Sequence, residues 1–575
     1  MVHFHLDLTA PHQHLVSVSL RLQPRQPSLR ISLPSWTPGS YLIRDYVRHL
    51  ERLSAEQNGN ALELRRLTPS CWQLRVDPAA GELLIRYGVM ATELSVRTCH
   101  VDGDHAFLAL AAVALEVEGE RWQPHLLSCS LPAGWEPFIP LPRDSEGHWC
   151  ARDFDQLLDT PVELGPHRAH GFVVGEVPHR WVTWGGRPGA GDWLLERFPS
   201  LLADVARVCE ACCRLMGVSR PAADSYLFVL HLLDEGYGGL EHDDSTVLVY
   251  GRRNFEKANG YRKFLQLVAH EYLHQWNVRR LRPAELTPID YHQPAIIPSL
   301  WFAEGVTSYV DQLLPLTAGL SQLDDLLVDL GDDLSRYLLT PGRHVQSLRS
   351  SSEEAWVKLY RADAYAGDSQ VSYYLKGAVV ALCLDLHLRA AGSSLALVLR
   401  TLWQSHGRWG RGYSEADLLA AFAGEAEDLR DLLPRWLHQH DDPDLNGYLR
   451  GVGLLLQPVM AGSAWAGFSC RSEAHGLIAH RVVRDGPAEA AGLMVGDELI
   501  ALDGERLRNS DQVPHLLCSG VVQELLVARH SQVRSLVLHC QPPCIERYQL
   551  VRDPEAAPEA LQRQCRWLAL SEGPW

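Results

Sequence analysis

The stretch His270-Glu271-Tyr272-Leu273-His274 places two histidines four residues apart, with a glutamate directly after the first. On an α-helix this spacing turns both imidazoles to one face, where they can hold one zinc ion. The glutamate then lies beside the metal and can take the proton from a zinc-bound water. The alternative is a chance match on an ordinary amphipathic helix. The rest of the chain must therefore supply a third ligand and the substrate contacts.

The pattern around this motif predicts a mostly α-helical catalytic domain over residues 171–450. Apolar residues recur at helical spacing from Gly260 to Arg280, and Pro283 ends the predicted helix. A strand is predicted over Ser225–Leu230, and the other helical patterns cover residues 320–339, 374–390 and 415–437.

Two histidines leave a zinc peptidase one protein ligand short, and a carboxylate from a following helix commonly completes the site. The downstream candidates are Glu285, Asp290, Glu304 and Asp311. Glu304 is favoured because it lies among apolar neighbours on a predicted helix over residues 300–309, with Ser299 as its N-cap. An unpaired carboxylate would be costly to bury there, and metal ligation removes that cost. The alternative is an ion pair with a basic side chain.

Residues 1–170 predict a β-sandwich-like domain. Apolar and polar residues alternate in Val16–Leu22 and again in Leu83–Tyr87, as they do in half-buried strands. The Pro-Gly pair within Trp36-Thr37-Pro38-Gly39-Ser40-Tyr41 indicates a turn between strands. Nothing in this region demands a catalytic role.

A third domain is predicted over residues 452–553, followed by a tail over residues 554–575 for which we make no functional prediction. A strand over Gly476–Val483 leads into Asp485–Leu493 and then Gly496–Gly504. This order of strand, Gly-Pro-Ala turn, short helix, Gly-Asp and hairpin turn resembles a PDZ domain of the bacterial protease type.

A PDZ domain binds the C-terminus of an extended peptide at a sheet edge, and the resemblance implies such a ligand here. The loop that grips the terminal carboxylate is expected at Trp465–Phe468, without a clear Gly-Leu-Gly-Phe signature. The helix lining the groove is expected to start near Ser510-Asp511 and to include Val513, Leu516 and Leu517. Equally, the domain can be a docking element that packs on the catalytic domain.

Composition excludes several other classes of function. The chain has 575 residues, enough for about three domains, and a formal charge of -17, which argues against nucleic acid or an anionic membrane as the main partner. The N-terminus lacks the pattern of a signal peptide. The longest apolar run, Ala106–Leu115, is about half the length of a bilayer-spanning helix, so no membrane span is predicted. Thirteen cysteines without paired metal spacing fit free thiols in a reducing cytoplasm.

The zinc motif and the segment Trp301-Phe302-Ala303-Glu304-Gly305 together resemble the gluzincin metallopeptidases, in which a W-x-x-E-G helix completes H-E-x-x-H. The gap from His274 to Glu304 is longer than in the better-known aminopeptidases of that clan and is rich in proline. Together with Leu33–Tyr41 and the terminal PDZ-like domain, the chain is similar to the glycyl aminopeptidase family. The resemblance implies a multidomain α+β fold, with an N-terminal β-sandwich-like domain, a thermolysin-like mostly α catalytic domain and a C-terminal PDZ domain. It also implies one Zn²⁺ per chain, held by His270, His274 and Glu304.

Two further motifs take their meaning from this resemblance. Gly238-Gly239-Leu240-Glu241-His242 resembles the G-x-M-E-N strand that lies along the substrate, where the glutamate binds the free α-amine. The residues alone fit equally well a glycine-rich turn with two exposed charged side chains. His242 replaces asparagine, which puts the backbone-binding role of that position in doubt.

Tyr374-Leu375-Lys376-Gly377 resembles the Y-x-K-G segment whose tyrosine donates a hydrogen bond to the oxyanion. Tyr373 is adjacent, and on a helix at most one of the two faces the metal. The register of the motif favours Tyr374. Without the motif, a tyrosine here is most simply a packing residue.

The resemblance thus implies a cytoplasmic zinc aminopeptidase that releases small N-terminal residues, Gly or Ala, from peptides with a free N-terminus. Glu271 and Tyr374 are then the catalytic residues, and Gly238, Gly239 and Glu241 bind substrate. The alternatives are a zinc endopeptidase or dipeptidase of the same clan, or a catalytically silent peptide-binding protein that carries a PDZ domain.

Overall fold

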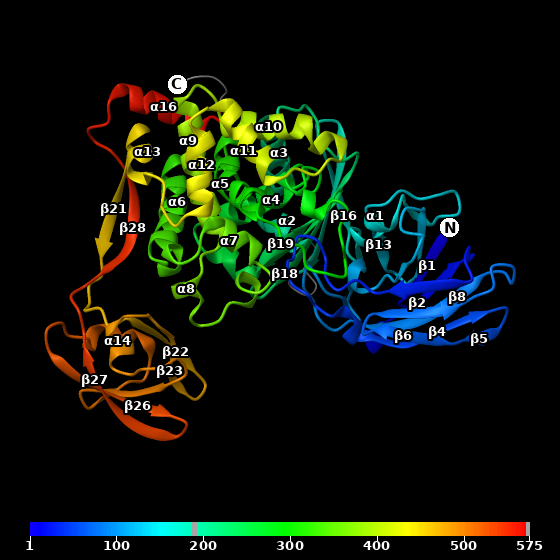
Figure 1. Cartoon of the computed structure of the whole chain (residues 1–575), viewed down its shortest axis with the longest axis horizontal. Coiled ribbons are helices and arrows are strands. Elements are labelled where there is room, and N and C mark those ends of the chain that lie inside the picture. The colour runs from blue at the N-terminus through cyan, green and yellow to red at the C-terminus, as the bar shows by residue number, and fades with distance from the viewer. Residues whose placement is uncertain (187–191, 571–575) are drawn as a thin grey trace. The chain divides into compact units, whose positions relative to one another are not determined.

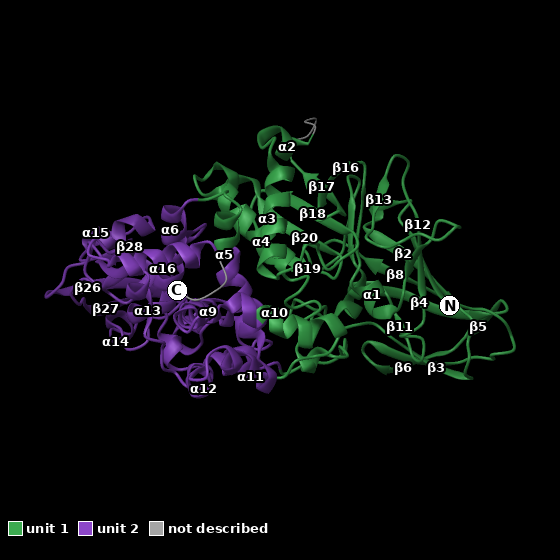
Figure 2. Ribbon diagram, turned by 90° about the horizontal axis from the view of Figure 1, so that it is seen from above, with its two compact units in different colours: residues 1–296, 313–321, 399–414 green, residues 297–312, 322–398, 415–575 purple. Residues whose placement is uncertain are grey.

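The computed structural model describes residues 1–186 and 192–570, in two compact units (Figure 2). Unit 1 contains Met1–Ile296, Leu313–Ser321 and Leu399–Ser414. Unit 2 contains Ile297–Gln312, Gln322–Val398 and Glu415–Trp575. The division falls within two helices, α5 (Val306–Thr317) and α10 (Leu395–Ser405). The last five residues of the predicted tail lie outside the described residues.

Unit 1 begins with a β-rich portion, coloured blue to cyan in Figure 1. Its largest sheet has seven strands in the order β14-β12-β1-β2-β8-β4-β5. Val16, Val18 and Leu20 alternate into the core along β2, which confirms the strand predicted there. The strands of this sheet are β1 (Val2–Asp7), β2 (Leu15–Leu22), β4 (Leu50–Gln57), β5 (Asn60–Leu62), β8 (Leu83–Met90), β12 (His125–Ser130) and β14 (Trp149–Ala151).

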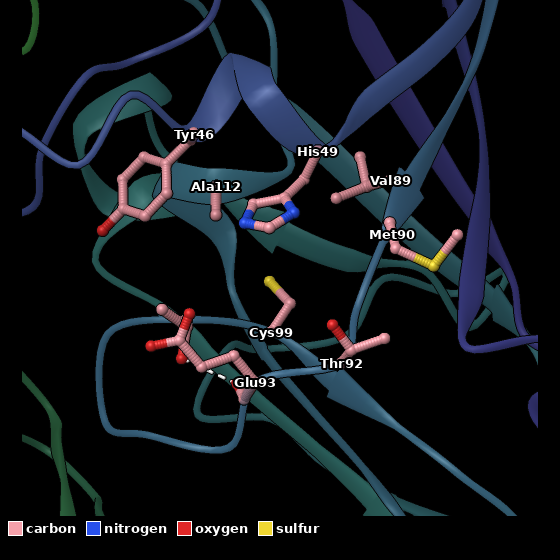
Figure 3. A pocket seen from close by; sticks show the side chains of 9 residues that line it. Tyr46, His49, Val89, Met90, Thr92, Glu93, Cys99 and Ala112 are labelled. Carbon is pink, nitrogen blue, oxygen red and sulfur yellow. Dashed lines mark hydrogen bonds between the residues drawn. The ribbon is translucent and has the colours of Figure 1, made fainter.

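Two four-stranded sheets complete the β-rich portion. One runs β11-β3-β7-β6, with bounds Glu116–Val117, Ser28–Ser32, Cys71–Arg75 and Leu64–Thr68. The other runs β13-β15-β10-β9, with bounds Glu136–Phe138, Pro161–Gly165, Ala106–Ala109 and His100–Val101. A cavity of about 10 Å³ is lined by residues that include Tyr46, His49, Met90 and Cys99 (Figure 3). It has room for about one water molecule and none for a peptide.

A five-stranded sheet in the order β16-β17-β18-β20-β19 follows in the same unit. Strands β17 (Val177–Gly185), β18 (Tyr226–Leu233) and β20 (Ser245–Gly251) are parallel, and the edge strands β16 (Ala169–Val174) and β19 (Tyr237–Glu241) are antiparallel to their neighbours. Strand β18 is buried along nearly its whole length, as expected for the middle of a parallel sheet. This sheet packs on the β13-β15-β10-β9 sheet through one shared apolar cluster. The cluster contains residues of β10, β13, β18, β19 and β20.

Helix α4 (Gly260–Leu273) packs against β19 and β20 and against α3 (Leu201–Leu215). It ends at Leu273, not at Arg280 as the sequence pattern predicts. The imidazole Nδ1 of His274 donates to the backbone carbonyl of Asn277 at 2.6 Å, and this bond needs a turn where a helix would continue. The short helices α1 (Phe154–Leu158) and α2 (Trp193–Arg197) also belong to unit 1.

Unit 2 is mainly helical around α9 (Tyr373–Ala390), which is buried on nearly all sides (Figure 1). The helix predicted over residues 415–437 is two helices, α11 (Glu415–Glu425) and α12 (Leu429–His438), with Asp428 at the N-cap position of the second. The other helices here are α6 (Leu323–Leu338), α7 (Leu348–Glu353), α8 (Ala366–Ser369) and α13 (Leu445–Gly451).

The rest of unit 2 is a ribbon, a small sheet and a final helix. Strands β21 (Leu454–Met460) and β28 (Ile545–Arg552) pair antiparallel, and β28 packs on α6. Between them lies a sheet in the order β22-β23-β24-β26-β27, with bounds Phe468–Glu473, Gly476–Val482, Glu498–Leu502, Val522–Arg529 and Gln532–His539, and with β25 (Glu505–Arg506) paired to β24. Helices α14 (Pro487–Ala490) and α15 (Val513–Leu516) accompany this sheet, and α16 (Pro558–Leu568) ends the unit.

Within the described ranges, no single helix is both long enough and apolar enough to cross a membrane. A bent pair of helices, Tyr373–Ala390 with Leu395–Trp409, passes that test on length and composition alone.

Candidate active site

His270 lies in the last turn of α4, and His274 is the C-cap residue that follows it. Their ring centroids are 4.6 Å apart and the rings are perpendicular, at 89°. His274 is 1% exposed, and its bond to the Asn277 carbonyl holds the proton on Nδ1. In this tautomer Nε2 carries the lone pair, and metal-ligating histidines usually have their other ring nitrogen bonded in this way. Sequence analysis missed Asn277, because a backbone acceptor leaves no residue-type signal.

Three residues of unit 1 converge next to this turn. Ligand-type atoms of Glu241, Glu271 and His274 all lie within 4.8 Å of one another, and all three residues are buried. Edge strand β19 passes so close that a Cβ atom at Gly239 would lie 2.3 Å from the Glu271 carboxyl carbon. Glycine at this position therefore lets the strand backbone lie directly against the Glu271 carboxylate.

Glu241 is 4% exposed and ends strand β19, so the alternative of a glycine-rich turn with exposed charged side chains is wrong. Its Oε1 accepts no hydrogen bond from any residue in the described part of the chain. A buried carboxylate oxygen normally has a partner. A ligand with a positive charge and N–H donors would supply one.

The loop Trp36–Tyr41 covers Glu241, which sequence analysis did not anticipate. Gly39 has φ +81°, and a Cβ atom there would lie 2.7 Å from both carboxylate oxygens of Glu241. The loop is anchored by the indole Nε1 of Trp36, which donates to the Asp290 carbonyl at 2.8 Å. The N-terminal portion thus contributes backbone to the candidate site.

A charged network behind the site joins the end of the zinc motif to the end of β19. Arg279 is 5% exposed and lies 2.7 Å from Asp159 and 3.1 Å from Asp243. Burial opposes ionisation of Asp243, but Arg279 and Arg280 hold the pKa of its carboxyl well below the usual range. The Nδ1 of His242 lies 3.1 Å from Asp159 in the same network. His242 therefore positions the end of β19.

In unit 2, Glu304 lies in a π-helical turn, Trp301–Gly305, that leads into α5. The carboxylate is 2% exposed. The Ser299 carbonyl accepts from the Ala303 N–H at 3.2 Å, as at an N-cap, but the side-chain cap comes from Ser352, whose hydroxyl accepts from the Trp301 N–H at 3.1 Å. The turn packs closely on α9, where a Cβ atom at Gly305 would lie 2.5 Å from the Cα of Gly377. π-Helical turns are frequent at functional sites, since they re-aim one side chain.

The adjacent tyrosines of α9 have different surroundings. Tyr373 is fully buried, whereas Tyr374 is partly exposed and its hydroxyl lies 3.2 Å from the hydroxyl of Tyr360. Tyr374 is therefore the more accessible of the two tyrosines. Tyr360 was not predicted, and no motif marks it.

The predicted site residues thus fall into two groups. Unit 1 holds Gly238, Gly239, Glu241, His270, Glu271 and His274, and unit 2 holds Glu304 and Tyr374. Of the rejected ligand candidates, Glu285 and Asp290 are exposed and Asp311 is half-buried.

Comparison with known protein families gives two matches. Residues 3–166 match the Peptidase M61 N-terminal domain, and residues 263–380 match the M61 glycyl aminopeptidase domain. The second match contains the whole zinc motif together with Glu304 and Tyr374. A search of curated protein sequences finds no match.

Solved structures extend the likeness over the whole chain. An aminopeptidase N family protein from Idiomarina loihiensis superposes with a TM-score of 0.91 at 29% identity, covering 99% of this chain and 100% of that one. Aminopeptidase A from Legionella pneumophila gives a TM-score of 0.50 at 11% identity, covering 96% of this chain and 56% of that one, which shows a shared fold alone. An M1 zinc metallopeptidase from Deinococcus radiodurans gives 0.47 at 16% identity, covering 77% and 94%.

The family matches fall on the N-terminal β-rich portion and on the segment that carries the zinc motif, and the Idiomarina structure spans nearly all of the chain. The chain therefore belongs to the M61, glycyl aminopeptidase, family and is a metallopeptidase.

Proposed function

We propose that this metallopeptidase is a zinc aminopeptidase that releases small N-terminal residues, Gly or Ala by preference, from peptides with a free N-terminus. The convergence of Glu241 and Glu271 beside His274 carries the proposal. Two buried carboxylates this close repel each other unless a cation lies between them or beside them. The α-ammonium of a peptide is such a cation. The Gly or Ala preference is inferred from the family resemblance.

The donor set fits one zinc ion per chain, with His270, His274 and Glu304 as the proposed ligands. The bond from His274 to the Asn277 carbonyl supports this assignment, because it orients the ring and places the proton on Nδ1, as is usual for histidines that bind a metal through Nε2. The burial of Glu304 supports it too, since a buried carboxylate needs positive charge nearby. When bound, zinc supplies Lewis-acid activation of water and of the scissile carbonyl.

The protein groups have separate roles in this proposal. Glu271 accepts a proton from the attacking water and returns it to the leaving amine. The Tyr374 hydroxyl donates a hydrogen bond to the developing oxyanion. Glu241 pairs with the substrate ammonium, which fixes the first peptide bond and excludes internal ones. Gly238 and Gly239 let the substrate backbone approach β19.

Hydrolysis of free and N-acetylated Gly- and Ala-anilides tests the proposal. We expect the free substrates to be cleaved and the acetylated ones to be cleaved at least about 100-fold more slowly, because acetylation removes the charge that Glu241 binds. Equal turnover of both forms would indicate an endopeptidase and exclude the amine-binding role. A wider panel of aminoacyl anilides tests the preference for small residues.

Two substitutions with a matched control assign the roles. Glu271→Gln should lower kcat by about 10³-fold, and Glu241→Gln should lower kcat/KM for free anilides by about 100-fold. Glu235→Gln is the control, since Glu235 is 81% exposed and lies just before β19. Retained activity in Glu271→Gln would contradict the assigned base. No hydrolysis by the parent with full zinc would favour a silent peptide-binding protein.

For residues 452–553 we propose PDZ-like binding of a peptide C-terminus. Strand β22 is at a sheet edge and can accept an added strand. A cavity of about 520 Å³ lies at one end of α15, lined in part by Ser463, Pro514 and Leu517. The docking alternative also has support, because the Arg484 backbone N–H donates to buried Asp368 of α8 at 3.3 Å.

A library of peptides with free C-termini, compared with the same peptides amidated, tests this binding. We expect selective capture of the free form by the full chain and its loss in Leu517→Lys, which places a charge in the cavity. Val537→Lys is the control, because Val537 is 55% exposed on β27 and does not line the cavity. Equal capture of amidated peptides would favour the docking role.

A further inference from the structure

A second cluster of metal-ligating side chains lies in unit 1, apart from the residues discussed above. His105 directly precedes β10, Glu163 is in β15 and His231 is in β18. All three side chains are fully buried, at 0% exposure. One ligand-type atom from each lies within 4.8 Å of those of the other two. The cluster therefore joins the β13-β15-β10-β9 sheet to the five-stranded sheet.

The hydrogen bonds among the described residues leave this cluster incomplete. Both ring nitrogens of His105 are buried without a hydrogen-bond partner. His231 uses Nε2 on Glu163 Oε2 at 2.9 Å, and its Nδ1 has no partner. A neutral imidazole carries one donor and one acceptor, and buried polar atoms are nearly always satisfied. The unsatisfied nitrogens of two adjacent histidines point to a ligand.

The walls around the cluster are aromatic. Trp184 stacks on His105 with ring centroids 3.7 Å apart, and Phe107 lies edge-on to His231 at 5.0 Å. A neutral imidazole has one ring nitrogen with a lone pair to offer a metal ion.

We propose that His105, Glu163 and His231 bind a structural zinc ion that joins the two sheets of unit 1. Two neutral imidazoles and one carboxylate are ligands that zinc takes. His167 is the fourth ligand, because its Nε2 lies 3.1 Å from Glu163 Oε1 and its ring nitrogens have no hydrogen-bond partner among the described residues. Asp102 lies 3.8 Å from His105 Nδ1, where it can orient that ring once the metal is bound.

The burial of this cluster indicates a structural metal site and not a catalytic one. A structural zinc site is closed by four protein ligands, whereas a catalytic site keeps a position open for water. The three core ligands are inaccessible to solvent, so no substrate reaches them. Their strands connect to the candidate active site, since β18 pairs with β20 and β20 pairs with β19, which carries Glu241. The ion would therefore hold in place the sheet on which Glu241 lies.

Metal analysis of the full chain distinguishes this proposal from the proposed function. After zinc-replete purification and exhaustive dialysis, we expect two equivalents of zinc in the parent and one in the double variant His270→Ala/His274→Ala. We also expect one equivalent in Glu163→Gln and none when all three changes are combined. One equivalent in the parent and none in the double variant would overturn the second site. One equivalent in both would support the second site and contradict zinc at the catalytic motif.

Substitutions in a core can prevent folding, so two further measurements are needed. His125→Gln is a matched control, because His125 is 1% exposed and lies outside the cluster, with Nδ1 bonded to the Gln123 carbonyl. It should keep two equivalents. In the chelator-treated His270→Ala/His274→Ala variant, adding zinc should raise Tm by about 5 °C or more, because a ligand that binds the native state stabilises it. A Tm that zinc leaves unchanged would overturn the proposal without any substitution in the cluster.

Discussion

Gly39 and Glu241 meet at a separation that only glycine permits. The backbone of Gly39 is in the left-handed region, and the carboxylate of Glu241 fills the space that a Cβ atom would take. Gly39 is in a loop about two hundred residues before Glu241 in the chain, so no local sequence pattern predicts this contact. The placement of the proposed amine-binding carboxylate therefore depends on a residue with no side chain of its own.

Gly39→Ala should lower kcat/KM for free Ala-anilide by about 10-fold to 100-fold, because the new methyl group displaces the Glu241 carboxylate. Gly59→Ala is the matched control. Gly59 has a similar φ of +74°, but nothing lies within 4 Å of an added Cβ atom. Both variants should lose about 1 kcal/mol of stability from backbone strain, and only Gly39→Ala should lose activity. Equal activities would show that the Gly39 contact does not position Glu241.

The network of Arg279 with Asp159 and Asp243 makes stability depend on pH. A carboxyl group whose pKa is lower in the folded than in the unfolded state contributes stability that is fully present above about pH 4. That stability is lost as the pH falls towards the folded pKa. The pKa of Asp243 is lowered in this way, against the effect of burial, by Arg279 and Arg280.

Between about pH 5 and about pH 3 the parent should lose about 1 kcal/mol more unfolding free energy than Asp243→Asn does. Urea unfolding at several pH values measures the difference. Asp224→Asn is the control, because Asp224 is 98% exposed and its ion pair with Arg220 contributes little. Parallel pH profiles of parent and Asp243→Asn would contradict the assigned shift.

Among the elements, the contact between the π-helical turn Trp301–Gly305 and α9 decides how Glu304 and Tyr374 are presented in unit 2. Gly305 and Gly377 let the two backbones touch, so the W-x-x-E-G and Y-x-K-G motifs are two halves of one helix contact. Both motifs end in glycine for this packing reason.

Gly305→Ala should destabilise the protein by about 1–3 kcal/mol and lower kcat, because the added methyl group meets the α9 backbone and moves Glu304. Gly424→Ala is the control within helix α11, where nothing lies within 4 Å of an added Cβ atom. That change should stabilise the protein by about 0.5–1 kcal/mol. Denaturant unfolding and zinc content measure both effects. Wild-type stability in Gly305→Ala would refute the close contact.

At the scale of the whole molecule, the end of the chain returns to the helix that follows Glu304. Trp567 of α16 is fully buried, and its indole Nε1 donates to the hydroxyl of Tyr309 at 2.7 Å. That hydroxyl in turn donates to Asp385 of α9 at 2.8 Å. Helix α16 of the tail, for which sequence analysis made no functional prediction, is thus part of the core of unit 2.

Trp567→Ala should cost about 3–5 kcal/mol of unfolding free energy through the cavity it leaves and the lost hydrogen bond. Leu561→Ala on the same helix is the control, since Leu561 is 45% exposed and should cost less than about 1 kcal/mol. Thermal unfolding compares the two variants. Similar losses in both would show that the tail is not packed as described.

The elements predicted well are those with strong periodicity. Strand β2 and helices α6 and α9 lie within about three residues of their predicted bounds, because burial on one face or on all faces leaves a pattern in the sequence. The predicted C-terminal end of α4 and the continuity of the 415–437 helix were wrong. Helix α4 stops at Leu273, where His274 bonds to the Asn277 carbonyl, and the second pattern is interrupted between Glu425 and Leu429.

Residue types at short spacing are enough to predict the zinc motif, the W-x-x-E-G and Y-x-K-G segments and the family of this protein. The contact of Gly39 with Glu241, the ion pairs of Arg279 behind the site, and the meeting of His105, Glu163 and His231 between two sheets are visible only in the folded chain. Such contacts join residues far apart in the chain. Strand pairing and core packing bring them together, and a local sequence pattern records neither.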